Sequence, residues 1–326
     1  MPKKAFPEAW IFEVSLFPNY IATFRGFWVL VDLIGQKLGR MGSHLSLYAI
    51  NRMETSPLKG KVVNISELMD PGLVVFTGVI LDSFLACVWE VLYKLKKKGV
   101  PIVFLGASGG YRGLQDSKVM TWVESKLKKL KPEKLFLFSR DSETYERYAD
   151  YFEFSYDGIC PAFFIDEWYT PPKTQEEFVV AVFDRIPEPK INTVYKIIRA
   201  HHNVLESPYS GFVKNLGSLL LATKAGGLKR GNTLVSHVLE DYLFLYANAK
   251  EVHSDRIHAC VAALAYGRPA RLYISSPRVG LFDKVVNGDI TKELVTVNRS
   301  RLEAEKEKLV SILREELRRT VDDSRK

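Results

Sequence analysis

An arginine and a histidine, Arg256 and His258, lie two positions apart at the start of a predicted helix. Segment 251–273 has the pattern of a short strand, a polar turn containing Ser254, a helix and a further strand. A helix N-terminus offers free backbone N–H donors and the positive end of the helix dipole, and a guanidinium adds a fixed cation. The pattern therefore predicts an anion site in which a histidine is placed to move a proton.

A second arginine, Arg140, lies in the polar turn that follows the strand predicted at residues 135–138. Loops at the carboxyl ends of parallel strands line the ligand crevice of α/β proteins. A guanidinium fork matches planar oxyanions, so Arg140 and Arg256 would clamp a small anion between two halves of the chain. The same turn also fits a simple helix cap, in which Asp141 or Ser142 accepts from the next turn.

Weaker candidates lie in other loops. A glycine-rich loop with Gly109, Gly110 and Arg112 follows the strand predicted at residues 100–106, but glycine is common in ordinary tight turns. In the second half, His201 follows a predicted strand, and Lys214 precedes a glycine-containing stretch with the character of a cleft loop. We expect these residues at the edge of the site.

The order of predicted elements is typical of an α/β protein with mostly parallel sheets. In the first half, the runs typical of buried strands are residues 10–16, 61–65, 73–77, 100–106 and 135–138. In the second half, the predicted strands are residues 178–183, 194–199, 251–253 and 271–274, and the predicted helices are residues 233–246 and 257–266.

A stretch with two prolines between residues 168 and 175 marks a domain boundary. We predict two Rossmann-like α/β domains facing a cleft, formed by residues 1–170 and 175–295, the second carrying the arginine–histidine pair. Residues 296–326 are predicted to form an amphipathic helix, packed back on the body, and a charged tail.

The composition is that of a folded, basic chain. Its 326 residues suffice for about two domains, and 46 lysines and arginines against 38 acidic residues give a net charge of +8. This charge favours acidic partners, but without a recognised nucleic-acid fold we expect no nucleic-acid binding. The 3 cysteines have no metal-ligand spacing, so we expect neither a disulfide scaffold nor a metal site.

The sequence predicts a cytoplasmic protein. Pro7, Glu8 and Glu13 interrupt the N-terminal apolar stretch before it reaches the length of a secretory signal. The apolar stretch of residues 72–93 contains Asp82 and is therefore expected to form a buried strand and a helix rather than a membrane span. The basic charge is compatible with peripheral contact at the inner face of the membrane. The oligomeric state is not predicted.

The segment around Arg256 and His258 resembles the polysaccharide pyruvyl transferase family. The hallmark of this family is an Arg-x-His step that opens a helix, followed by a Gly-x-Pro, which Gly267 and Pro269 match. The Arg-Asp turn that ends the family's first domain is matched by Arg140 and the residue after it. The resemblance follows the order of elements over roughly two thirds of the chain.

This resemblance implies a GT-B-like fold and transfer of the pyruvyl group of phosphoenolpyruvate to hydroxyls of a glycan or lipid-linked sugar, forming a ketal. Arg140, Arg256 and Ser254 would bind the carboxylate and phosphate of the donor. His258 would protonate its methylene carbon, with Arg256 sharing in catalysis. Phosphoenolpyruvate is then a donor substrate, and neither a cofactor nor a metal is expected.

Two departures from the family pattern keep other functions open. The glycine- and asparagine-rich turn after the first strand is missing from residues 17–26, and Cys160 stands where members carry an aspartate before Pro161. A nucleotide-sugar glycosyltransferase fits the same architecture. A non-catalytic glycan-binding relative fits the altered turn and the cysteine.

Overall fold

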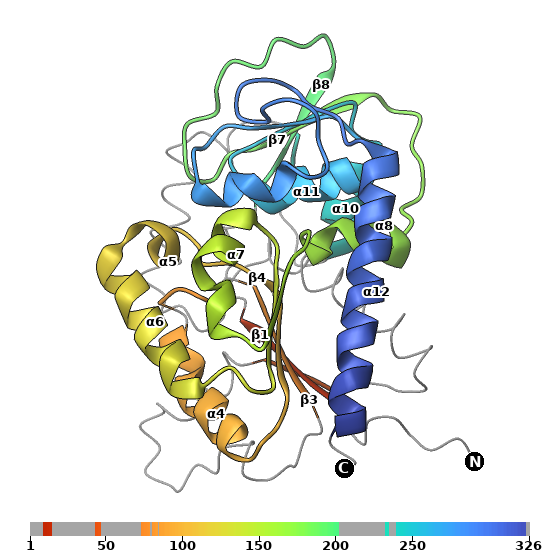
Figure 1. Ribbon diagram of the computed structural model, residues 1–326. Coiled ribbons are helices and arrows are strands. Elements are labelled where there is room, and N and C mark those ends of the chain that lie inside the picture. Colours follow the sequence, from red (N-terminus) through yellow and green to blue (C-terminus); the bar gives the residue numbers. More distant parts are fainter. Residues whose placement is uncertain are drawn as a thin grey trace, which may run out of the picture.

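Two parallel sheets organise the chain (Figure 1). The computed structural model describes residues 9–14, 43–46, 73–78, 80–83, 85–201, 232–234 and 239–323. Within these ranges, six strands form the first sheet in the order β2-β1-β3-β4-β5-β6, and five form the second in the order β11-β10-β7-β8-β9. Neighbouring strands in both sheets pair in parallel, which confirms the predicted α/β class.

From β3 onward, strands and helices alternate in the first half. The strands are β1 (Ala9–Val14), β2 (Ser43–Ser46), β3 (Leu73–Gly78), β4 (Ile102–Ala107), β5 (Leu135–Ser139) and β6 (Phe154–Asp157). The helices are α4 (Leu85–Lys97), α5 (Arg112–Gln115), α6 (Ser117–Leu130), α7 (Ser142–Tyr148) and the 3-10 turn η1 (Ala149–Tyr151). Every residue of β4 and β5 is buried, as expected for central strands covered on both faces.

The second half begins after a connection that contains η2 (Pro161–Phe164) and α8 (Ile165–Trp168). Its strands are β7 (Phe178–Val182), β8 (Lys196–Ala200), β9 (Thr233–Leu234), β10 (Val252–Ser254) and β11 (Ala270–Leu272). Its helices are α10 (Leu239–Asn248), α11 (Ile257–Ala265), the 3-10 turn η3 (Pro277–Phe282) and α12 (Arg299–Asp323). The predicted boundary at 168–175 falls between α8 and β7, and the domain limits themselves stay a prediction.

Apart from His258, helix α11 consists of apolar residues, and all of its residues are buried. A helix of this kind must be covered on every side. It packs against β10 and α10 of its own half and against η2 and α8 of the connection. Figure 1 shows it between the second sheet and α7. The start of this helix is therefore held at the junction of the two halves.

Helix α12 packs back onto the body, as predicted. Its buried leucines, Leu302, Leu309, Leu313 and Leu317, belong to one apolar core with residues of both sheets. Near its start, the almost fully buried Lys306 forms ion pairs of 2.9 Å with two carboxylates of α8. In Figure 1 the helix runs alongside both halves. Among the described helices, none is long and apolar enough to cross a membrane.

The sequence-based prediction was wrong at one element, the helix expected over residues 233–246. Thr233–Leu234 forms the short strand β9, and α10 begins only at Leu239. The β-branched Thr233 pairs with Arg199 of β8, so sheet pairing overrides the local helical pattern. The strands β2 and β6 were not predicted, and the strand expected at residues 61–65 lies outside the described residues.

Candidate functional site

The turn between β5 and α7 directs Arg140 into the protein. The Asp141 carboxylate accepts a hydrogen bond of 2.8 Å from the backbone N–H of Thr144 and so caps α7. The side chain of Arg140 is almost completely buried, with 1% of the residue exposed. The turn is therefore a helix cap formed by Asp141, and binding of an anion by the buried Arg140 stays a prediction.

At the start of α11, Ser254 shapes the turn that carries Arg256. Its hydroxyl accepts from the Arg256 backbone N–H at 2.7 Å and donates to the carbonyl of the same residue at 3.1 Å. The buried Arg256 guanidinium donates through Nε to Asp184 at 3.2 Å. Ser254 therefore positions Arg256, and its predicted contact with a substrate stays a prediction.

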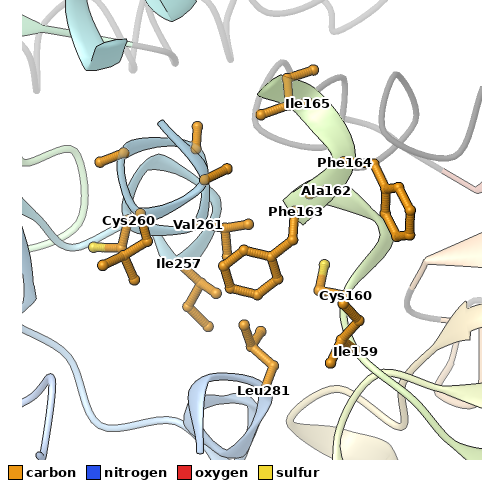
Figure 2. Packing of buried hydrophobic residues seen from close by; sticks show 14 of the residues in the cluster. Ile159, Cys160, Ala162, Phe163, Phe164, Ile165, Ile257, Cys260, Val261 and Leu281 are labelled. Atoms are coloured by element: carbon orange, nitrogen blue, oxygen red, sulfur yellow. The ribbon is translucent and has the colours of Figure 1, made fainter. Parts of the chain in front are cut away.

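His258, in the first turn of α11, lies against the connection between the two halves. Its Nε2 is 3.8 Å from the Sγ of Cys160, which precedes η2. Figure 2 shows the segment of Cys160 and Phe163 facing Ile257 and Val261 of α11. Gly106 of β4 allows Pro161, the residue after Cys160, to lie close to this strand, because a Cβ on Gly106 would be 2.5 Å from the Pro161 ring.

The positive charges of three arginines from different parts of the chain act on His258. Burial, followed by the positive charges of Arg140, Arg278 and Arg185, holds the pKa of His258 well below its usual range. Arg278 lies in η3, and Arg185 follows β7. A cationic, buried environment of this kind favours a bound anion, because an anion would offset the positive charge that acts on His258.

Cys160 belongs to the same cluster as His258, Arg140, Arg185 and Arg278. Burial raises the pKa of its thiol, and the charge of Arg140, together with hydrogen bonds from Ala162 and Arg140 and the charge of Arg278, acts in the opposite direction. Because the effect of burial on the pKa is the largest, the Cys160 thiol stays neutral. A carboxylate at this position would instead offset the positive charge of an arginine. Cys160 therefore adds no negative charge beside Arg140.

The side chain of Asp157, at the end of β6, connects the turn that contains Arg140 with the second half of the chain. Its carboxylate accepts from the Ser142 hydroxyl at 2.8 Å and pairs with Lys284 at 2.6 Å. Lys284 also donates to the backbone carbonyl of Gly158 at 2.9 Å. This network connects the segment after η3 to the turn that holds Arg140, and so supports the geometry of the cluster.

The weaker candidates are placed differently. The N–H of Gly109 donates to the Thr144 hydroxyl at 2.9 Å, and the N–H of Gly110 donates to Ser108 at 3.2 Å. Both amides are therefore engaged inside the fold, and the side chain of Arg112 is exposed. Lys214 lies outside the described residues. The contacts of this loop bind it to α7 rather than to His258.

His201, by contrast, is buried beside Arg256. Its Nδ1 lies 3.0 Å from Asp184, the same carboxylate that binds Arg256. Sequence reasoning missed Asp184, Arg185 and Arg278. The first two follow β7 directly, so the end of a predicted strand was the available signal for them. Arg278 follows a proline in a turn, and no pattern around it indicated a site.

The depressed pKa of His258 makes stability depend on pH. His258 takes up a proton near pH 6.5 in the unfolded chain but stays neutral in the folded protein. The free energy of unfolding therefore keeps its full value above that pH and decreases as the pH falls below it. The loss is at most about 1.4 kcal/mol per pH unit. We expect the melting temperature of the wild-type protein to decrease more between pH 7 and pH 5 than that of His258→Gln. Equal decreases would contradict the depressed pKa of His258.

Two solved structures superpose on most of this chain. The structure of Staphylococcus aureus MnaA with UDP superposes with a TM-score of 0.54 at 11% identity, covering 96% of this chain and 90% of that chain. A putative UDP-N-acetylglucosamine 2-epimerase from Listeria monocytogenes gives 0.53 at 10% identity, with the same coverage of both chains. At this identity the likeness shows the fold alone, which is GT-B-like as predicted.

Comparison at the level of sequence is more specific. No curated protein matches the chain. A family model described as polysaccharide pyruvyl transferase matches residues 73–277, which is more than half of the chain. The matched range contains Arg140, Cys160, Arg256 and His258. The protein is therefore a transferase of the glycan-modifying kind and belongs to the polysaccharide pyruvyl transferase family.

Proposed function

We propose that the protein transfers the pyruvyl group of phosphoenolpyruvate to two hydroxyls of a glycan or lipid-linked sugar, forming a cyclic ketal and releasing phosphate. The observation that supports this most strongly is the action of Arg140, Arg185 and Arg278 on the buried His258. Phosphoenolpyruvate is a compact trianion, and a site for it needs several cations close to one proton donor. The family membership agrees with this chemistry.

Binding of the donor would prepare His258 for its role. In the empty site the histidine is neutral, because burial and then the arginine charges disfavour its protonated form. A bound trianion compensates those charges, so the histidine takes up a proton as the donor binds. Arg140 and Arg256 would contact the carboxylate and phosphate, since guanidinium groups bind such oxyanions in pairs of hydrogen bonds.

The reaction then needs no cofactor. His258 protonates the methylene carbon of phosphoenolpyruvate, and the adjacent carbon becomes electrophilic. One sugar hydroxyl adds to this carbon, phosphate leaves with the electron pair of its C–O bond, and a second hydroxyl completes the ketal. The neutral Cys160 contributes no charge that would compete with the donor for Arg140. Its presence is thus compatible with catalysis.

A nucleotide-sugar glycosyltransferase is the second candidate, because the structures with similar folds include one solved with UDP. Phosphate release separates the two functions. The purified protein is incubated with phosphoenolpyruvate and a panel of methyl hexosides and lipid-linked glycans. We expect phosphate to appear only when both donor and acceptor are present. Binding of UDP-sugars without any response to phosphoenolpyruvate would overturn the proposal in favour of glycosyl transfer.

A further inference from the structure

We propose that His201 is the general base that takes the proton of the attacking acceptor hydroxyl, and that Asp184 is the residue that positions it. This inference rests on the proposed function and adds to it the base that the reaction requires. His201 would accept a proton from the acceptor hydroxyl, whereas His258 donates a proton to phosphoenolpyruvate.

The two residues meet Arg256 at one edge of the second sheet. Asp184 follows β7, His201 follows β8, and Arg256 follows β10, and these strands are neighbours in the order β10-β7-β8. Parallel strands place their carboxyl ends at the same edge, where α/β folds bind ligands. The contacts of Asp184 therefore lie on the same edge as the start of α11.

The Asp184 carboxylate joins a base to an anion-binding group. Its Oδ1 lies 3.0 Å from His201 Nδ1, and its Oδ2 accepts from Arg256 Nε at 3.2 Å. The side chains of all three residues are at least nine-tenths buried. An ionised carboxylate only accepts hydrogen bonds, so His201 must carry its proton on Nδ1. The lone pair of the neutral ring is then on Nε2, the arrangement of a general base.

In the described part of the fold, the two outer atoms of this hydrogen-bonded group lack partners. Among the described residues, neither His201 Nε2 nor Arg256 Nη2 has a hydrogen-bond partner, although both atoms are buried. Leaving a buried polar group without a partner is energetically unfavourable, and a ligand that bonds to it would remove this cost. An anionic oxygen fits Arg256 Nη2, and a hydroxyl fits His201 Nε2.

The proton balance closes with two histidines. In the first step the acceptor oxygen bonds to the central carbon of phosphoenolpyruvate, its proton passes to His201 Nε2, and His258 delivers a proton to the methylene carbon. In the second step the C–O bond to phosphate breaks, and phosphate accepts the proton held by His201. The second hydroxyl attacks and returns a proton to His258. The products are the ketal and hydrogen phosphate.

The test separates turnover from donor binding. His201→Gln removes the base and leaves the bond between Asp184 and Arg256 in place. We expect phosphate release with acceptor to fall about 10²- to 10⁴-fold, the range typical of a lost general base, because His201 Nε2 is buried and water is a poor substitute for it. The Kd for phosphoenolpyruvate, measured by calorimetry, should stay within about twofold of wild type.

His253→Gln is the matched control. His253 is also buried in the second sheet, but both of its ring nitrogens have partners within the fold, Tyr273 at 2.8 Å and Glu251 at 3.0 Å. This variant should retain turnover even where it lowers the melting temperature. Asp184→Asn should lower turnover and also weaken donor binding, since it affects Arg256 as well, and Asp184→Glu should restore part of both.

Three results would overturn the inference. Wild-type turnover in His201→Gln would show that His201 is not the general base. Parallel loss of donor binding and turnover in His201→Gln would assign His201 to the donor site or to structure. A wild-type protein that binds no phosphoenolpyruvate would overturn the proposed function and the role of His201 together, whereas the first two results leave pyruvyl transfer standing.

Discussion

Replacing His258 by glutamine is expected to reduce phosphate release from phosphoenolpyruvate and acceptor by about 10²- to 10⁴-fold, the range typical of a lost general acid. Glutamine keeps a polar side chain of similar length beside Cys160 but cannot deliver a proton to carbon. The surroundings of His258 are buried, so water is a poor substitute donor. Initial rates of phosphate release at saturating donor measure this effect.

The control for His258→Gln is again His253→Gln, since both histidines are almost fully buried in the second half of the chain. Only the His258 variant should lose turnover. It should still bind phosphoenolpyruvate, because the arginines that attract the anion are unchanged. A His258→Gln protein with wild-type rates would show that this histidine does not protonate the donor.

Replacing Arg140 by glutamine is expected to weaken binding of phosphoenolpyruvate by about 10²- to 10⁴-fold. The guanidinium would make two charge-assisted hydrogen bonds to one oxyanion, each contributing about 1.5–3 kcal/mol, and every 1.4 kcal/mol corresponds to a factor of ten in Kd. Because Arg140 lies among the groups that act on His258, its loss should also raise the pKa of that histidine. Calorimetric titration of the donor gives the Kd directly.

Arg147→Gln provides a matched control on α7, the helix that follows the Arg140 turn. Arg147 is partly exposed and pairs with Glu124, away from the cluster. Its replacement should leave donor affinity unchanged, and melting temperatures show whether either variant is misfolded. Equal donor affinity in Arg140→Gln and Arg147→Gln would exclude Arg140 from the donor site.

The fold class and the start of α11 could be predicted from local patterns. Buried strands such as β4 are continuous apolar runs, and the step from Arg256 to His258 is visible because it opens a helix of small apolar residues. The strand β9 was not predictable in this way, since its two residues are fixed by pairing with β8. Elements determined by distant partners leave little trace in a short window of sequence.

The same limit applies to the site. Arg140 and Arg256 were found because each follows a predicted strand, but their surroundings depend on contacts between distant segments. The bond between Asp184 and His201 joins two loops of the second sheet. The contact of Cys160 with His258 spans 98 positions in the sequence. The chemistry of the cysteine, a neutral thiol beside arginines, follows from burial, which composition and spacing do not reveal.

Calorimetric titration of phosphoenolpyruvate in buffers of different ionisation enthalpy measures whether His258 takes up a proton when the donor binds. Because burial and the arginine charges keep His258 neutral in the empty protein, the trianion should bind with uptake of close to one proton near neutral pH. The His258→Gln variant should bind the donor without this uptake. Absence of donor binding in wild type would exclude phosphoenolpyruvate as the donor, and proton uptake that persists unchanged in His258→Gln would show that His258 is not the group that takes up the proton.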